Sequence, residues 1–284
     1  MQLLVLVHLL LNVAGLLLWL RWREERLLSA RRAGGGTLLA TLRKAGRTPV
    51  YRWSNLGLLV GLVLVRALAY WHMGSAIGWT PAIGLGAIVL SFRSDFLGRM
   101  VLFSFASLVV FIAEFYFWLL LISVINRKVS DADPWQNRVR AHLGWIERWP
   151  AGLKLLLPFL LTAMVWAGLA PLLARLGFQL PAKSMSHTIQ QAGVLGLASY
   201  LVWKYLMVGL LLSHLVTSYV YFGNAPFWTF VNHTGRNLLW PIRWMPLRLG
   251  QIDLAPAAAA ALVLFLGELG LRELPKLYAR LPLW

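Results

Sequence analysis

The chain has 284 residues, of which 59% are hydrophobic and only 13% are charged, against roughly 25% charged residues in an ordinary soluble domain. This composition excludes a soluble globular protein and predicts a polytopic membrane protein. The chain has no cysteine, which excludes disulfides, thiolate metal sites and a cysteine nucleophile. The net charge of +17 favours anionic lipid over nucleic acid as a partner, because Lys and Arg gather between apolar runs.

Long apolar runs predict the membrane helices, each of which needs about 20 residues to cross a bilayer. The runs are 2–20, 56–72, 101–125, 153–174, 192–222 and 254–271. The first lacks a basic start and an A-x-A exit and exceeds a signal-peptide core, so we expect a retained anchor helix. A seventh run, 77–92, is short and contains three glycines and a proline, which favours a re-entrant segment. We therefore predict an all-α transmembrane helical bundle with six to seven spans.

The basic loops predict the orientation in the membrane. Nine Lys and Arg residues against two Glu in 21–55 indicate a cytoplasmic loop and an N-terminus outside. If 77–92 does not span, the basic loops 126–152 and 223–252 are also cytoplasmic; if it spans, both move outside. The charge bias favours the first arrangement.

Two C-terminal segments share one order of features. Each has an apolar helix, a Pro-aromatic turn, the pattern W-x-x-R-W, and a second helix with a proline in its first turns. The W-x-x-R-W patterns run from Trp145 to Trp149 and from Trp240 to Trp244. This internal repeat predicts a membrane extension in 1–100, with anchor helix, basic loop and span, then helix-loop-helix repeats in 101–185 and 186–284.

The first repeat also predicts an amphipathic helix on the membrane surface in 135–149. Its apolar side chains would face the acyl chains and its arginines the headgroups. These are Val139, Leu143 and Ile146 against Arg138 and Arg140.

The stretch "LLWPIRWMPLRLGQIDLAP" (238–256) resembles the signature of the YggT (YlmG) family of integral membrane proteins. That signature is approximately L-L-x-P-I-R-R, a proline-containing spacer, G-G-I-D-x-S-P and a transmembrane helix. Trp244, Gln251 and Ala255 depart from it, and the first repeat lacks the I-D element. "VRALAYW" (65–71) also resembles a family element, R-A-L-L-S-W. The chain is thus similar to a divergent member with an N-terminal extension.

The resemblance implies a small protein of the bacterial inner membrane, linked to membrane organisation, envelope or division. In plastid relatives it implies cofactor assembly of a cytochrome complex. We expect a non-catalytic scaffold, accessory or assembly subunit that contacts other integral membrane proteins and anionic lipids. The alternatives are a haem-assembly factor and a small channel or transporter.

The signature residues are the first candidate site. We interpret Asp253 as the N-cap of the last helix and Pro256 as a first-turn residue. In the alternative, Arg243, Arg248 and Asp253 bind a lipid phosphate or an acidic tail. The full set is Pro241, Arg243, Pro246, Arg248, Asp253 and Pro256.

Four ionisable residues inside the predicted spans are the second candidate site: Arg66, Glu114, Lys204 and Glu268. We expect them to pair between helices, with Glu114 opposite Lys204 because the two occupy equivalent places in the repeats. A proton or ion path and snorkelling at helix ends are the alternatives.

No cofactor or enzymatic activity is predicted. The six histidines are not paired at helical spacing, and no C-x-x-C-H pattern exists, so haem ligation is disfavoured. The histidines are His8, His72, His142, His187, His214 and His233. The chain also lacks the P-loop, H-E-x-x-H and G-x-S-x-G patterns.

Overall fold

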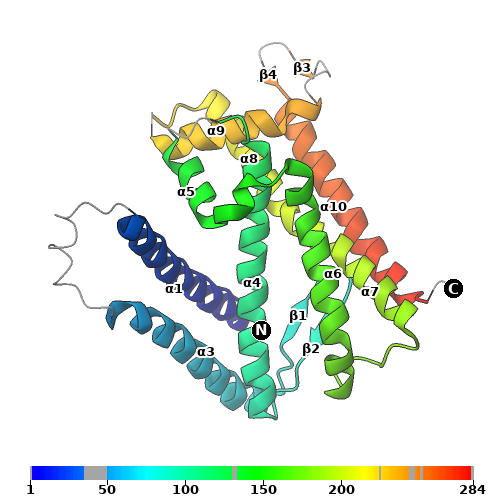
Figure 1. Ribbon diagram of the computed structural model, residues 1–284. Coiled ribbons are helices and arrows are strands. Elements are labelled where there is room, and N and C mark those ends of the chain that lie inside the picture. The colour runs from blue at the N-terminus through cyan, green and yellow to red at the C-terminus, as the bar shows by residue number, and fades with distance from the viewer. Residues whose placement is uncertain are drawn as a thin grey trace. The chain divides into compact units, whose positions relative to one another are not determined.

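The structure is a computed structural model that describes residues 2–34, 50–129, 133–223, 225–242, 247–249 and 252–282. Its α-helices are α1 (Gln2–Gly34), α3 (Val50–Ile77), α4 (Leu97–Ile125), α5 (Pro134–Leu143), α6 (Ala151–Arg175), α7 (Met185–Ala198), α8 (Trp203–Tyr219), α9 (Pro226–Leu238) and α10 (Ala255–Ala279) (Figure 1). Short 3-10 helices are η2 (Gly144–Arg148), η3 (Ser199–Val202) and η4 (Trp240–Ile242). The predicted all-α class is confirmed.

Five helical segments of the described chain are long and apolar enough to cross a membrane. They are Leu4–Glu25, Ser54–Gly74, Leu97–Ile125, Ala151–Arg175 and Met185–Tyr219. The last contains α7, η3 and α8, so the predicted span 192–222 is a longer segment with a 3-10 turn in its middle. The predicted span 254–271 forms the helix α10, but it is not among the five.

The segment 77–92 forms a hairpin after the end of α3. Strands β1 (Ala82–Gly84) and β2 (Val89–Ser91) pair, and the amide of Leu85 donates to the carbonyl of Ile88 at 2.8 Å. A two-stranded hairpin exposes unpaired backbone groups at its edges, which lipid cannot satisfy. A non-spanning segment is therefore favoured over a seventh span.

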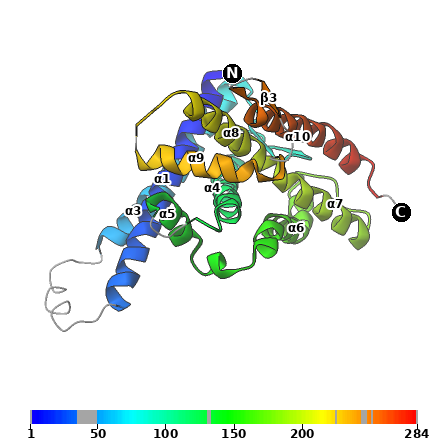
Figure 2. The same ribbon diagram turned by 90° about the horizontal axis from the view of Figure 1, so that it is seen from above.

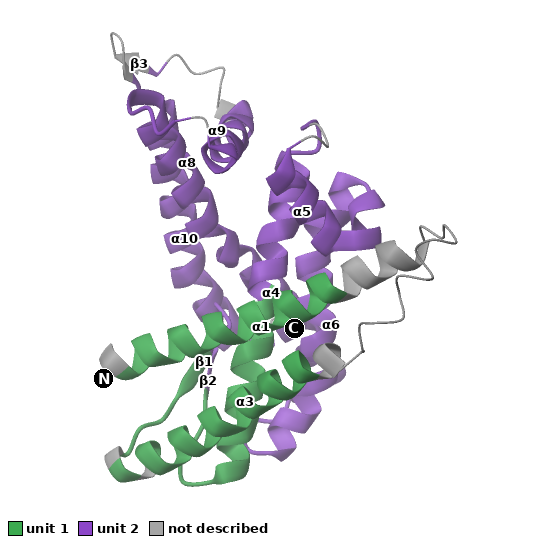
Figure 3. Ribbon diagram, turned by 90° about the vertical axis from the view of Figure 1, so that its left-hand side faces the viewer, with its two compact units in different colours: residues 1–83, 91–113 green, residues 84–90, 114–284 purple. Residues whose placement is uncertain are grey.

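The chain divides into two compact units (Figure 3). Unit 1 comprises residues 1–83 and 91–113, and unit 2 comprises 84–90 and 114–284. Helix α4 contributes to both, so the predicted boundary at residue 100 falls inside a helix. Both predicted repeats lie in unit 2, except for residues 101–113.

Within unit 2, the helices follow one another in the same order twice. The end of α4 leads to α5, η2 and α6, while α8 leads to α9, η4 and α10. Short helices α5 and α9 each begin with a proline in the first turn, where the missing N–H costs nothing. The two pack together at the C-terminal end of α4, and α9 runs across the axis of that helix (Figures 1 and 2).

The apolar face of α5 packs on protein, which corrects the prediction that it faces lipid. Val139 and Leu143 are buried in a core cluster with Phe117 and Leu120 of α4 and Phe230 of α9. Amphipathic periodicity identifies the apolar face of a helix but does not say what covers it. One face of α5 thus belongs to the core of unit 2.

Candidate functional site

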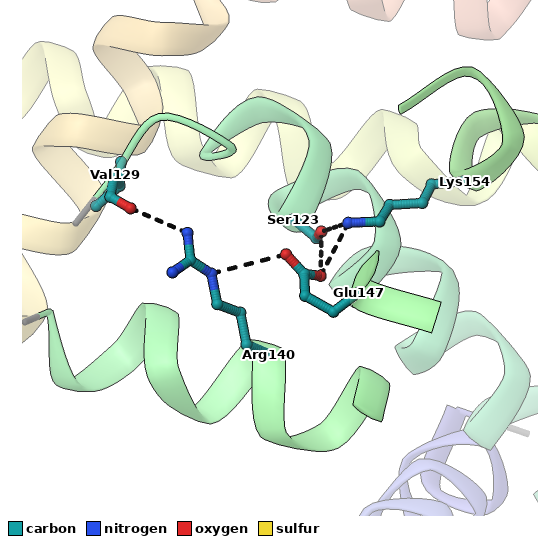
Figure 4. Close-up of polar contacts among 5 residues, drawn as sticks. All are labelled: Ser123, Val129, Arg140, Glu147 and Lys154. Carbon is teal, nitrogen blue, oxygen red and sulfur yellow. Dashed lines mark hydrogen bonds and ion pairs between the residues drawn. The ribbon is translucent and has the colours of Figure 1, made fainter. Parts of the chain in front are cut away.

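Three side chains from three other elements of unit 2 meet around the carboxylate of Glu147 (Figure 4). The ammonium of Lys154 lies 3.0 Å from Glu147 Oε2 and donates to Ser123 Oγ at 2.9 Å. Ser123 donates to Glu147 Oε2 at 2.5 Å. On the other side, Arg140 Nε lies 3.7 Å from Glu147 Oε1. We call this set the Glu147 network.

Local sequence explains why these groups converge. Asp133 accepts from the amides of Trp135 and Gln136, which starts α5. Gly144 ends that helix with φ +61°, a conformation that favours glycine. The chain then turns through η2, which brings Glu147 back over the end of α4 and beside the first turn of α6.

The Glu147 network connects the four consecutive elements of the first repeat by side-chain contacts. Ser123 lies on α4, Arg140 on α5, Glu147 on η2 and Lys154 on α6. Arg140 also donates to the carbonyl of Val129, which follows α4, at 2.9 Å. Lys154 is only 5% exposed, so its ammonium has little access to water and depends on Glu147 and Ser123 as partners. These contacts hold the side chains of the network in one arrangement.

Sequence reasoning missed the centre of this network. It placed Arg140 toward lipid headgroups and did not single out Glu147 or Lys154. One signal was present: Glu147 is the only acidic residue between positions 134 and 252, among several bases. A single acid in a basic loop is a natural centre for ion pairs.

Two tryptophans lie exposed on the surface of unit 2, one of them on the turn that holds Glu147. Trp145 in η2 is 68% exposed and Trp240 in η4 is 76% exposed. Each is the first tryptophan of a W-x-x-R-W pattern, and the Trp145 ring packs edge-on against Trp149 with centroids 4.9 Å apart. Exposed indoles on a fixed turn suit contact with a membrane interface or with another protein.

The signature motif forms a second hairpin before α10. Strand β3 (Arg248–Leu249) pairs antiparallel with β4 (Ile252–Asp253), with Arg248 opposite Asp253. The amide of Asp253 donates to the hydroxyl of Tyr219 at 2.8 Å. Arg243 and Pro246 lie outside the described residues, and Pro241 is exposed in η4.

Asp253 binds the start of α10 but is not its N-cap. Its carboxylate accepts from the amide of Ala255 at 3.0 Å, whereas Leu254 occupies the N-cap position. Pro256 lies in the first turn. The N-cap therefore lies one residue after the predicted position. Strand β4 ends at Asp253, and only Leu254 separates it from the helix.

The predicted pair of Glu114 and Lys204 is not formed. Lys204 Nζ instead lies 3.5 Å from Glu268 Oε2, because α8 packs along α10. Gly267 allows this approach, since a Cβ there would overlap the Lys204 side chain. No Lys or Arg of the described residues pairs with Glu114. Equivalent places in two repeats therefore did not predict neighbours.

Arg66 lies in a polar cluster of unit 1. Its guanidinium donates to Asn12 Oδ1 at 2.6 Å and to the Ser104 carbonyl at 3.2 Å. Asn12 donates to Ser107 at 3.2 Å, and Ser107 contacts His8 Nε2 at 3.0 Å. Arg66 is only 2% exposed, and its partners here are neutral rather than the acid that we expected. These hydrogen bonds join α1, α3 and α4, as polar side chains do between membrane helices.

These observations define the class of the molecule: it is a helical integral membrane protein whose polar side chains mainly hold helices and turns together. No protein-family model, curated protein or solved structure matches the chain. The resemblance to the YggT family therefore depends only on the sequence patterns of residues 238–256 and 65–71.

Proposed function

We propose that the protein is a non-catalytic scaffold or assembly subunit that binds other integral membrane proteins, in the bacterial inner membrane. The observation that carries the proposal is the Glu147 network, which fixes the turn bearing Trp145. Its contacts hold α4, α5, η2 and α6 together around a turn whose Trp145 side chain is 68% exposed. Tryptophan is among the residues enriched at the centres of protein interfaces.

Two further features support a binding role. Asp253 of the signature hairpin is joined to α8 through Tyr219 and to the start of α10 through its carboxylate, so β4 is held against both helices. Its similarity to the YggT signature favours a role in membrane organisation or complex assembly. Ion pairs and hydrogen bonds engage Arg140, Glu147 and Lys154 with one another, which suits structural charges better than reactive ones.

Site-specific photocrosslinking in cells tests this proposal. A photoreactive amino acid at Trp145 or Trp240 is expected to give a crosslink to one defined membrane protein. The matched control is Met164, which is 62% exposed on the span α6 and is expected to reach lipid. Equal protein crosslinks from Trp145, Trp240 and Met164 would contradict a specific binding surface.

A channel or transporter is the second candidate, and the Arg66 cluster is the observation that favours it. Buried ionisable groups in membrane helices often mark ion or proton paths. Flux of protons or anions into liposomes that contain the purified protein would support this function. Flux that persists after Arg66→Met would exclude the cluster as its path.

A further inference from the structure

A cavity of 530 Å³ lies between α8 and α9 in unit 2, outside the Glu147 network and the signature hairpin. Two polar stripes line it. Helix α8 contributes His214, Thr217 and Ser218, at spacings of three and four residues that share one face. Helix α9 contributes Asn232, His233 and Arg236 in the same way.

The floor of the cavity is built by direct contacts between the two helices. Asn232 Oδ1 accepts hydrogen bonds from His214 Nδ1 and from Thr217 Oγ1, the latter at 3.2 Å. Gly235 lies where a Cβ would overlap the His214 side chain. Only glycine allows α9 to lie this close to α8, so the cavity is a feature of the packing.

The charged donors in the cavity are basic residues of α9. The hydroxyl of Ser218 donates to the carbonyl of His214 at 2.8 Å. The single hydroxyl proton of Thr217 is shared between the same carbonyl, at 3.0 Å, and Asn232 Oδ1. Arg236 and His233 are exposed on α9 and form no ion pair or side-chain hydrogen bond among the described residues. No lining residue is acidic. The cavity therefore favours an anion that accepts hydrogen bonds at two oxygens.

The cavity also has an aromatic wall that follows the end of a candidate membrane span. Phe222 and Trp228 line it, with their rings stacked at a centroid distance of 4.8 Å. The apolar segment that precedes this wall ends at Tyr219. Aromatic rings beside a basic group at the end of a span match the boundary between headgroups and acyl chains.

We propose that this cavity binds the phosphodiester headgroup of an anionic phospholipid. Arg236 contacts two phosphate oxygens and His233 donates a further hydrogen bond, while the aromatic wall contacts the glycerol backbone. A soluble phosphate could accept hydrogen bonds from the basic donors, but it has no apolar part that could contact the aromatic wall. The site does not depend on the scaffold role, because the exposed tryptophans of that role do not line the cavity.

Native mass spectrometry of the full chain in detergent tests the proposal. The protein is titrated separately with phosphatidylglycerol, with phosphatidylcholine and with inorganic phosphate. We expect tight adducts with phosphatidylglycerol only, and no displacement by millimolar phosphate. Equal binding of the two lipids, or displacement by phosphate, would overturn the assignment.

Two variants locate the binding. Arg236→Gln is expected to weaken phosphatidylglycerol binding about tenfold, because it removes a charge-assisted contact. The matched control is Arg127→Gln, an exposed arginine after α4 that does not line the cavity, with less than about a twofold effect. Equal losses in both would show diffuse attraction to basic surface and would overturn the site.

A third variant keeps the charge and fills the space. Thr229→Leu places a branched apolar side chain at the cavity wall and should also reduce phosphatidylglycerol binding several-fold. Melting in detergent verifies that each variant is folded. If Arg236→Gln does not fold, retained binding in Thr229→Leu would still contradict the proposal. Crosslinking at Trp145 is expected to be unchanged in all three variants, so this proposal and the scaffold role can fail separately.

Discussion

At the scale of single residues, the small number of acidic side chains determines which ion pairs can form. The chain has ten Asp and Glu residues against 27 Lys and Arg, and two of the acids each lie near two bases. Glu147 lies between Arg140 and Lys154, and Glu268 lies between Lys204 and Arg272. Removing one of these acids leaves two positive charges close together without a counterion. Removing one base leaves the acid paired with the second base.

This asymmetry predicts the order of two substitutions in the Glu147 network. Glu147→Gln should lower the free energy of unfolding by about 3 kcal/mol, because the buried ammonium of Lys154 loses its counterion. Lys154→Met should cost only about 1 kcal/mol, since Glu147 keeps Ser123 and Arg140. Unfolding in detergent measures both, with the exposed Lys128→Met as control. A larger loss for Lys154→Met than for Glu147→Gln would contradict the network.

The observed partner of Lys204 predicts which mutant cycle shows coupling. Lys204→Met combined with Glu268→Gln should give a coupling energy of about 0.5–1 kcal/mol, because Glu268 is half-exposed. Lys204→Met combined with Glu114→Gln should be additive within about 0.5 kcal/mol. The free energy of unfolding of each single and double variant provides both cycles. Coupling confined to Glu114 would restore the pairing that the repeat suggested.

At the scale of elements, the short helices α5 and α9 were only partly predictable. The sequence predicted a helix in 135–149, which overlaps α5, but none in 226–238, where α9 lies. Both helices begin with a proline in the first turn, which fits there, although the sequence pattern was interpreted as a turn. Their spatial neighbours were not predictable, since Trp135 of α5 meets Phe227 and Phe230 of α9 from 92 and 95 residues away. The periodicity of a sequence identifies the apolar face of a helix. Which helix packs on that face depends on turns in other parts of the chain.

The close packing of α9 on α8 predicts opposite effects of two glycine substitutions on the stability of the protein. Gly235→Ala should destabilise the protein by about 1–3 kcal/mol, because the new methyl group overlaps His214. The control Gly209→Ala lies on α8, where a Cβ meets nothing within 4 Å, and should stabilise it by up to about 1 kcal/mol. Melting temperatures in detergent measure both. Equal responses would show that α9 does not pack closely at Gly235.

At the scale of the whole molecule, the long apolar runs were the most predictable feature. The predicted spans 101–125 and 153–174 agree with α4 and α6 within four residues at each end, because lipid leaves the backbone few alternatives to a helix. The 3-10 turn η3 within the predicted span 192–222 was missed. Neither a proline nor a charge marks it in the sequence, so composition gave no signal there.

The number of crossings predicts the sides on which three positions lie. The two spans Ser54–Gly74 and Leu97–Ile125 separate residue 37, which lies outside the described residues, from Lys128. The hairpin 82–91 adds no crossing. Thr37→Cys and Lys128→Cys should therefore react with a membrane-impermeant maleimide from the cytoplasmic side.

One further span, Ala151–Arg175, separates Lys128 from Leu180, which is 87% exposed. Leu180→Cys should therefore react only from the opposite side. The chain has no cysteine, so each single substitution reports one position, and labelling of intact cells against opened vesicles separates the two sides. Labelling of Thr37→Cys and Lys128→Cys from opposite sides would require an odd number of crossings between them. The segment 77–92 would then have to span the membrane, and the basic segments that follow α4 and α8 would both lie outside, against the charge bias that orients membrane helices.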